Sequence, residues 1–112
     1  MEARRLYPAL DNFIGGYFHQ NWIDVVQSRG DPKEYDYVVS HMLERNARAY
    51  LLDLIGDISR LLASGLGEEE VRHVIRKEFR GAIDPALRGS TMRAWLEYVK
   101  ERIDEHLKFS LR

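Results

Sequence analysis

The chain has 112 residues, of which 45% are hydrophobic and 31% charged, and it contains no cysteine. This length fits one domain with a substantial core, and six tyrosines, four phenylalanines and two tryptophans argue against intrinsic disorder. The formal net charge of -1 provides no overall field that would attract nucleic acid or an anionic membrane. We expect a single soluble, cytoplasmic domain over residues 1–112, with no disulfide, signal peptide or membrane-spanning segment.

The N-terminal part of the chain predicts an amphipathic helix that follows Pro8. Apolar residues recur at steps of three and four between Leu10 and Trp22, which places their side chains on one helix face. Gly15 and Gly16 lie within this pattern, and each lowers helix propensity by about 1 kcal/mol relative to alanine. We interpret the two glycines as a point of close backbone approach or a kink.

Two further helices are predicted in the middle of the chain. Residues 31–34 combine an aspartate cap, a proline at the first helical position and a glutamate three residues after the cap, a typical helix start. The clearest amphipathic pattern runs from Ala47 to Leu62. Because the two apolar stripes do not join smoothly, we predict a break near residues 44–46.

The C-terminal third predicts two more helices. Glycines end the preceding helix at residues 65 and 67, and Glu68–Glu70 open the next one, where the helix dipole favours negative charge. Residues 71–79 carry its buried stripe, residues 82–89 form a loop, and Ser90 caps the last helix. No segment alternates with the period of a strand. The prediction is therefore an all-α, compact, single-domain bundle of four to five helices.

No constellation of residues indicates catalysis. The chain lacks a cysteine nucleophile, a serine elbow and a glycine-rich phosphate loop. Glu70 and His73 have the spacing used in di-iron bundles, but no second pair of this kind occurs. We expect no enzyme activity, no metal and no cofactor.

Charge is distributed unevenly along the chain. Six basic and two acidic residues give residues 71–93 a net charge of +4. Arg72, Arg76 and Arg80 would share one helix face, either as a phosphate-binding stripe or, as we favour, as a solvated face over the core. Four basic and nine acidic residues give residues 31–70 a net charge of -5.

The acidic region has two interpretations that the sequence leaves open. Several of its acids lie at helix starts and serve capping and solubility, or the region forms a surface for a basic partner. Asp53 and Asp57 lie one turn apart on a polar face, where we expect both to be exposed. The candidate partner-binding residues are Glu34, Asp36, Asp53, Asp57, Glu68, Glu69 and Glu70.

Aromatic residues are concentrated at residues 7–22. The run Tyr-Pro-x-Leu-x-x-Phe-x-Gly-x-Tyr-Phe-His-Gln-Asx-Trp resembles the N-terminal signature of bacterial immunity proteins from contact-dependent growth inhibition systems. Residues 67–71 are similar to the acidic opening of that family's penultimate helix, and residues 90–99 to its closing segment. Two departures are Asn21, where the family usually has aspartate, and the segment 79–89.

The resemblance implies a small helical protein that binds and neutralises one toxin in the cytosol and catalyses no reaction itself. The toxin would be the C-terminal domain of a large exported protein, often a nuclease and in some cases one that cuts tRNA. No stable nucleic-acid or membrane partner is expected. The alternative is a small helical nucleic-acid-binding regulator that uses Arg72, Arg76 and Arg80.

Because family members share the aromatic run while facing different toxins, we interpret it as core rather than interface. We expect Trp22 and Trp95 to be buried, and His19 to orient the first helix through hydrogen bonds rather than to bind metal. The residues to which we assign a fold-specifying role are Tyr17, Phe18, His19, Gln20, Trp22 and Trp95.

Overall fold

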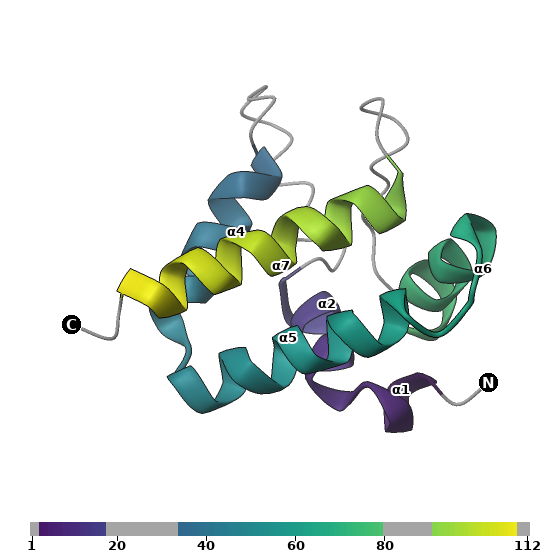
Figure 1. Ribbon diagram of the computed structural model, residues 1–112, viewed down its shortest axis with the longest axis horizontal. Helices are drawn as coiled ribbons and strands as arrows, with labels where there is room; N and C mark the ends of the chain where they lie inside the picture. The colour runs from purple at the N-terminus through teal and green to yellow at the C-terminus, as the bar shows by residue number, and fades with distance from the viewer. Residues whose placement is uncertain (1–2, 18–33, 80–90, 110–112) are drawn as a thin grey trace.

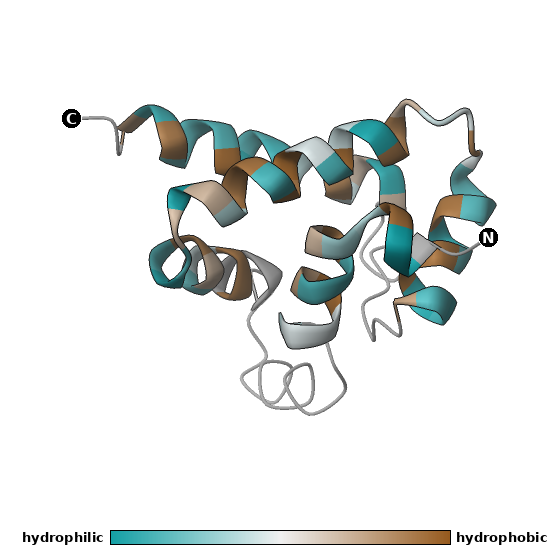
Figure 2. Ribbon diagram, turned by 90° about the horizontal axis from the view of Figure 1, so that it is seen from below, coloured by the Kyte–Doolittle hydropathy of each residue, from teal (hydrophilic) through white to brown (hydrophobic). Residues whose placement is uncertain are grey.

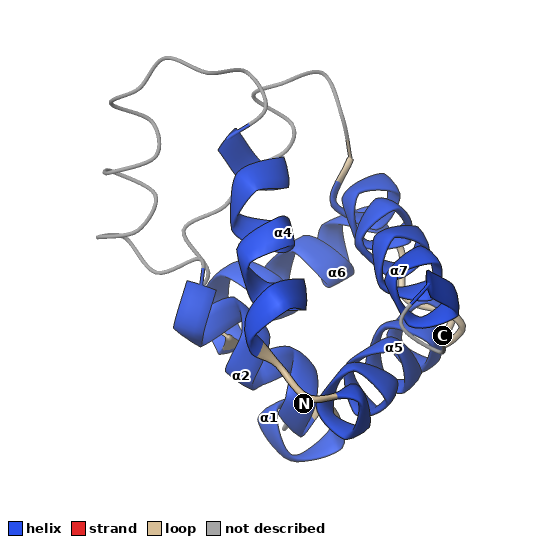
Figure 3. Ribbon diagram, turned by 90° about the vertical axis from the view of Figure 1, so that its left-hand side faces the viewer, coloured by secondary structure: helices blue, strands red, loops and turns tan. Residues whose placement is uncertain are grey.

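Helices dominate the part of the chain that the computed structural model describes, which is residues 3–17, 34–79 and 91–109. In chain order the elements are α1 (Ala3–Leu6), α2 (Pro8–Tyr17), α4 (Glu34–Arg45), α5 (Arg48–Leu62), α6 (Glu68–His73), the π-helical η1 (Val74–Glu78) and α7 (Met92–Phe109). No strand occurs within these ranges (Figure 3). The all-α prediction is confirmed. None of the described helices is long and apolar enough to cross a membrane.

Helix α2 begins at Pro8, where the missing N–H of proline costs nothing because the first amides of a helix have no intrahelical partner. Leu10, Phe13 and Ile14 form its buried face. Gly15 and Gly16 are exposed, and a Cβ added at either would meet no atom of the described residues within 4 Å. Among the described residues, neither glycine therefore marks a point of close backbone approach.

The predicted break between the two central helices is confirmed, since α4 ends at Arg45 and α5 starts at Arg48. The side chain of Asn46 stabilises the break. Its Nδ2 atom donates to the Met42 carbonyl oxygen at 2.8 Å and to the Tyr17 hydroxyl at 3.1 Å. One amide thus closes the end of α4 and ties it to the end of α2.

Helix α5 ends in a turn that contains Gly65, whose φ of +88° lies in the left-handed region that favours glycine. Helix α6 then starts at Glu68, as the acidic run predicts. The predicted buried stripe is also confirmed, because Val71, Val74, Ile75 and Phe79 are all buried.

The start of the last helix differs by one residue from the prediction. Helix α7 begins at Met92, and the Thr91 hydroxyl oxygen accepts a hydrogen bond from the Ala94 N–H at 3.0 Å. Thr91 is therefore the capping residue, in place of Ser90, which lies outside the described residues. Serine and threonine are adjacent here and both are good caps, so the sequence does not distinguish them.

The two longest helices, α5 and α7, run side by side in opposite directions, and α2 packs against another side of α5 (Figure 1). Hydrophobic and hydrophilic bands alternate along both long helices (Figure 2). Trp95 is buried, as predicted, and its ring stacks on that of Phe13 with 6.3 Å between centroids and 8° between planes. This pair joins α7 to α2 within the core.

Candidate functional site

Asp57 caps a helix that lies far from it in the sequence. Its Oδ2 atom accepts hydrogen bonds from the backbone N–H of Ala9 at 2.8 Å and of Leu10 at 3.1 Å. Oδ1 forms an ion pair with Arg60 one turn further along α5. The residue is only 4% exposed. The prediction that Asp57 is an exposed acid is wrong, because the first amides of α2 need an acceptor and the carboxylate supplies it.

Tyr50 makes a second link between α5 and α2. Its hydroxyl lies 3.1 Å from both the Ala9 carbonyl oxygen and Asn12 Oδ1, and donates to these acceptors. Burial, with smaller contributions from the neighbouring Tyr17 and Asp57, raises the pKa of Tyr50 to about 12. The hydroxyl therefore keeps its proton at neutral pH and remains a hydrogen-bond donor.

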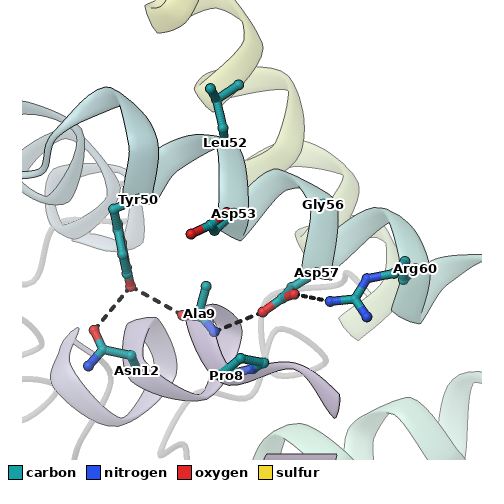
Figure 4. Close-up of a pocket in the computed structure, with 9 residues that line it drawn as sticks. All are labelled: Pro8, Ala9, Asn12, Tyr50, Leu52, Asp53, Gly56, Asp57 and Arg60. Carbon is teal, nitrogen blue, oxygen red and sulfur yellow. Dashed lines mark hydrogen bonds and ion pairs between the residues drawn. The ribbon is translucent and has the colours of Figure 1, made fainter. Parts of the chain in front are cut away.

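A cleft of about 690 Å³ lies beside these two links, between α2 and α5. Its lining residues from α2 and α5 are Pro8, Ala9, Asn12, Tyr50, Leu52, Asp53, Gly56, Asp57 and Arg60 (Figure 4). Asp53 lies between Tyr50 and Asp57 on the α5 side, opposite Ala9 and Pro8 (Figure 4). Asp53 is exposed, as predicted. We name this feature the α2–α5 cleft.

Glu68 caps the start of α7, as Asp57 caps the start of α2. Its Oε2 atom accepts from the backbone N–H of Met92 at 2.8 Å, and Oε1 accepts from that of Arg93 at 3.0 Å. The Arg93 guanidinium in turn donates to the carbonyl oxygens of Leu66 and Leu62, both at 2.8 Å. Both carboxylate oxygens of Glu68 are thus engaged within the fold.

Glu69 and Glu70 are exposed at the start of α6. They line a second cleft of about 300 Å³ together with His73 and Glu78. The backbone nitrogen of Gly67 lies 3.5 Å from Glu70 Oε1, so Glu70 accepts a hydrogen bond from the residue that precedes its helix. This second cleft shares no lining residue with the α2–α5 cleft.

The remaining predicted partner-binding residues, Glu34 and Asp36, lie in the first turn of α4, and their side chains lie outside the description. Among the residues to which a fold-specifying role was assigned, Tyr17 is half-buried. Its ring meets those of Phe13 and His41 at centroid distances of 6.0 and 6.2 Å. The motif residues outside the described part of the chain are Phe18, His19, Gln20 and Trp22.

The predicted arginine stripe does not keep regular α-helical spacing. Arg72 is half-buried in α6, whereas Arg76 is exposed in η1. In this π-helical segment the Phe79 N–H donates to the Val74 carbonyl oxygen at 2.9 Å, a wider turn than that of an α-helix. Arg80 lies outside the described residues.

Within residues 3–17, 34–79 and 91–109, no three histidine, aspartate or glutamate side chains gather closely enough to hold a metal ion. Of the residues that line the α2–α5 cleft, sequence reasoning singled out only Asp53 and Asp57 as site residues, and Tyr50 and Gly56 are among those that it missed. Tyr50 was predicted only as part of an apolar stripe. A glycine in the middle of a strongly amphipathic helix is a signal that could have directed attention to position 56.

Residues 6–103 match the family described as CdiI immunity protein. The chain belongs to this family, which confirms the resemblance drawn from residues 7–22. It is also similar in fold to a chain in the crystal structure of the CdiA-CT/CdiI complex from Y. kristensenii 33638, with a TM-score of 0.77 and 18% sequence identity. The match covers 93% of this chain and 99% of that chain. No curated protein matches the chain.

Proposed function

We propose that this protein binds and neutralises a cognate toxin, the C-terminal domain of a large exported CdiA-type protein, in the cytosol of the cell that makes it. The match to the CdiI immunity protein family over residues 6–103 carries this proposal. The structurally similar chain comes from a complex of CdiI with CdiA-CT, which supports a toxin domain as partner. Neutralisation occurs by binding alone, without a reaction catalysed by the immunity protein.

We further propose that the toxin is a nuclease, with tRNA as one candidate substrate. A nuclease groove is positively charged because it holds phosphates, and an inhibitor can bind it with carboxylates. Asp53, Glu69 and Glu70 support this proposal, since all three are exposed. Glu34 and Asp36 stay in the proposed set. Asp57 and Glu68 do not, because their carboxylates already accept backbone amides.

The test of the function uses the candidate toxin domain, defined as the C-terminal domain of the large exported protein encoded directly upstream of this chain. Mixed with this domain, the protein should co-elute from a sizing column at fixed stoichiometry and protect cells that express the toxin. The absence of a complex would contradict the proposal. Binding to generic duplex or tRNA instead, with a steep salt dependence, would favour a nucleic-acid-binding regulator.

The acidic contacts need a separate test that leaves the fold intact. We expect Asp53→Asn and the pair Glu69→Gln with Glu70→Gln to slow association with the toxin domain and to weaken its dependence on salt. Glu101→Gln and Glu105→Gln serve as controls, because both residues are exposed on α7. If neither set changes the association rate or the dissociation constant relative to the controls, the acidic contacts lie elsewhere, and the immunity function stands.

A further inference from the structure

Position 56 contributes no side chain to the α2–α5 cleft. Gly56 lies in the middle of α5 and lines this cleft. A Cβ added there would meet no atom of the described residues within 4 Å, and among those residues only Gly65 is a glycine with positive φ. Neither packing nor backbone conformation therefore requires glycine at position 56. Alanine would favour the helix, so glycine at position 56 lowers helix propensity and leaves this part of the cleft without any side chain.

The walls of the cleft are held in place before any partner arrives. Asp57 and Tyr50 both bind the first turns of α2 through hydrogen bonds of 2.8 to 3.1 Å. These contacts fix α2 against α5 on both sides of Asp53 (Figure 4). A site that is already ordered loses little conformational freedom when it is occupied, which favours tight binding.

The charged residues that line the cleft determine which kind of side chain it can bind. Asp57 is buried and paired with Arg60, and Arg60 also lies over the Tyr7 ring, with its guanidinium carbon 5.3 Å from the centroid. Asp53 is exposed and forms no ion pair with another described residue. In Figure 4, Arg60 lies beyond Asp57 as seen from Asp53. Among the described residues, no ion pair therefore compensates the negative charge at the Tyr50 end of the cleft.

An apolar side chain adjoins this charge. Leu52 is 45% exposed and lines the same cleft. A lysine or arginine satisfies both features, because its aliphatic stem packs on apolar surface while its charged end reaches a carboxylate. We infer that the α2–α5 cleft receives a lysine or arginine side chain of the toxin, next to Asp53 and above Gly56. This inference rests on the proposed function.

Because the chain contains no cysteine, Gly56→Cys introduces a single thiol that reports on the cleft. We expect the purified toxin domain, at saturation, to slow modification of this thiol by a maleimide about tenfold or more, since a filled cleft excludes the reagent. Glu101→Cys on the exposed side of α7 is the matched control, and its modification rate should not change. Equal rates with and without toxin for Gly56→Cys in a demonstrated complex would overturn the inference.

Side chains of different size at position 56 give an independent test, in which toxin affinity is measured. Gly56→Ala should keep toxin affinity and raise the thermal midpoint, whereas Gly56→Trp should fill the cleft and weaken binding about 30-fold or more. If Gly56→Trp lowers the thermal midpoint, Asp53→Asn replaces it, with an expected loss of about tenfold that high salt abolishes. Wild-type affinity in Gly56→Trp or in Asp53→Asn would overturn the inference while the immunity function stands. A wild-type chain that fails to bind the toxin domain would overturn both.

Discussion

The carboxylate of Asp57 lies 2.8 Å from the backbone nitrogen of Ala9, so a side chain of α5 caps a helix that begins 49 positions earlier in the sequence. The same oxygen accepts the N–H of Leu10. Capping by a residue outside the helix couples two elements that local sequence would leave independent. The start of α2 is therefore stabilised by its contact with α5.

Removal of this cap should destabilise the fold strongly. Asp57→Ala leaves two backbone amides and the Arg60 guanidinium without their acceptor, and we expect a loss of about 2–4 kcal/mol in the free energy of unfolding. Urea denaturation followed by circular dichroism measures it. Asp53→Ala, an exposed acid one turn away, should change stability by less than about 0.5 kcal/mol. Equal effects of the two substitutions would contradict the capping role.

The start of α7 allows a parallel experiment. Glu68→Ala removes the acceptor for the N–H groups of Met92 and Arg93, and we expect a loss of about 1–2 kcal/mol because the site is only half-buried. Glu69 is the exposed neighbour of Glu68, and Glu69→Ala should change the free energy of unfolding by less than about 0.5 kcal/mol. Thermal or urea unfolding compares the two variants. A larger loss for Glu69→Ala would be inconsistent with the structure.

Trp95 should be among the most sensitive core positions. Its side chain is 6% exposed and stacks on Phe13, so Trp95→Ala opens a large cavity and should cost about 3–5 kcal/mol. That is a large part of the stability of a small domain. Glu97→Ala, on the exposed side of the same helix, is the control. A thermal midpoint unchanged by Trp95→Ala would show that the packing of α2 against α7 is wrong.

The raised pKa of Tyr50 predicts how the free energy of unfolding changes at alkaline pH. Its pKa is about 12 in the folded protein and 10.0 ordinarily, so above pH 10 the unfolded chain releases the proton more readily than the folded chain. Protonated Tyr50 therefore contributes to the free energy of unfolding in full below pH 10, and this contribution is lost as the pH rises to about 12. Because the side chain is partly solvated, we expect this pH-dependent loss in the free energy of unfolding to be no more than about 1 kcal/mol.

The measurement is the free energy of unfolding between pH 9 and the highest pH at which the chain folds, for wild type and Tyr50→Phe. The variant should be less stable than wild type at neutral pH, because the links to Ala9 and Asn12 are lost. The difference between the two proteins should shrink as the pH rises through this window. A constant difference would contradict the raised pKa.

Local sequence determined where α2 and α6 begin and where α5 ends, because these signals act over one or two turns. The proline at residue 8, the glutamates at 68–70 and the glycine at 65 each mark a helix end through backbone chemistry that needs no tertiary contact. Apolar spacing likewise identified the buried stripe of residues 71–79. The aromatic run at residues 7–22 also indicated the family, since a long specific motif carries information that composition does not.

Only the tertiary structure decided what each acid does. Asp53 and Asp57 look equivalent in the sequence, yet a step of four residues rotates a side chain about 40° around the helix axis. That rotation directs Asp57 to the amides of α2 and leaves Asp53 exposed on the α2–α5 cleft. Glu68 and Glu69 diverge in the same way, because α7 begins beside only one of them. A carboxylate's role depends on which unsatisfied amide lies within reach, and that is settled only when separate helices pack together.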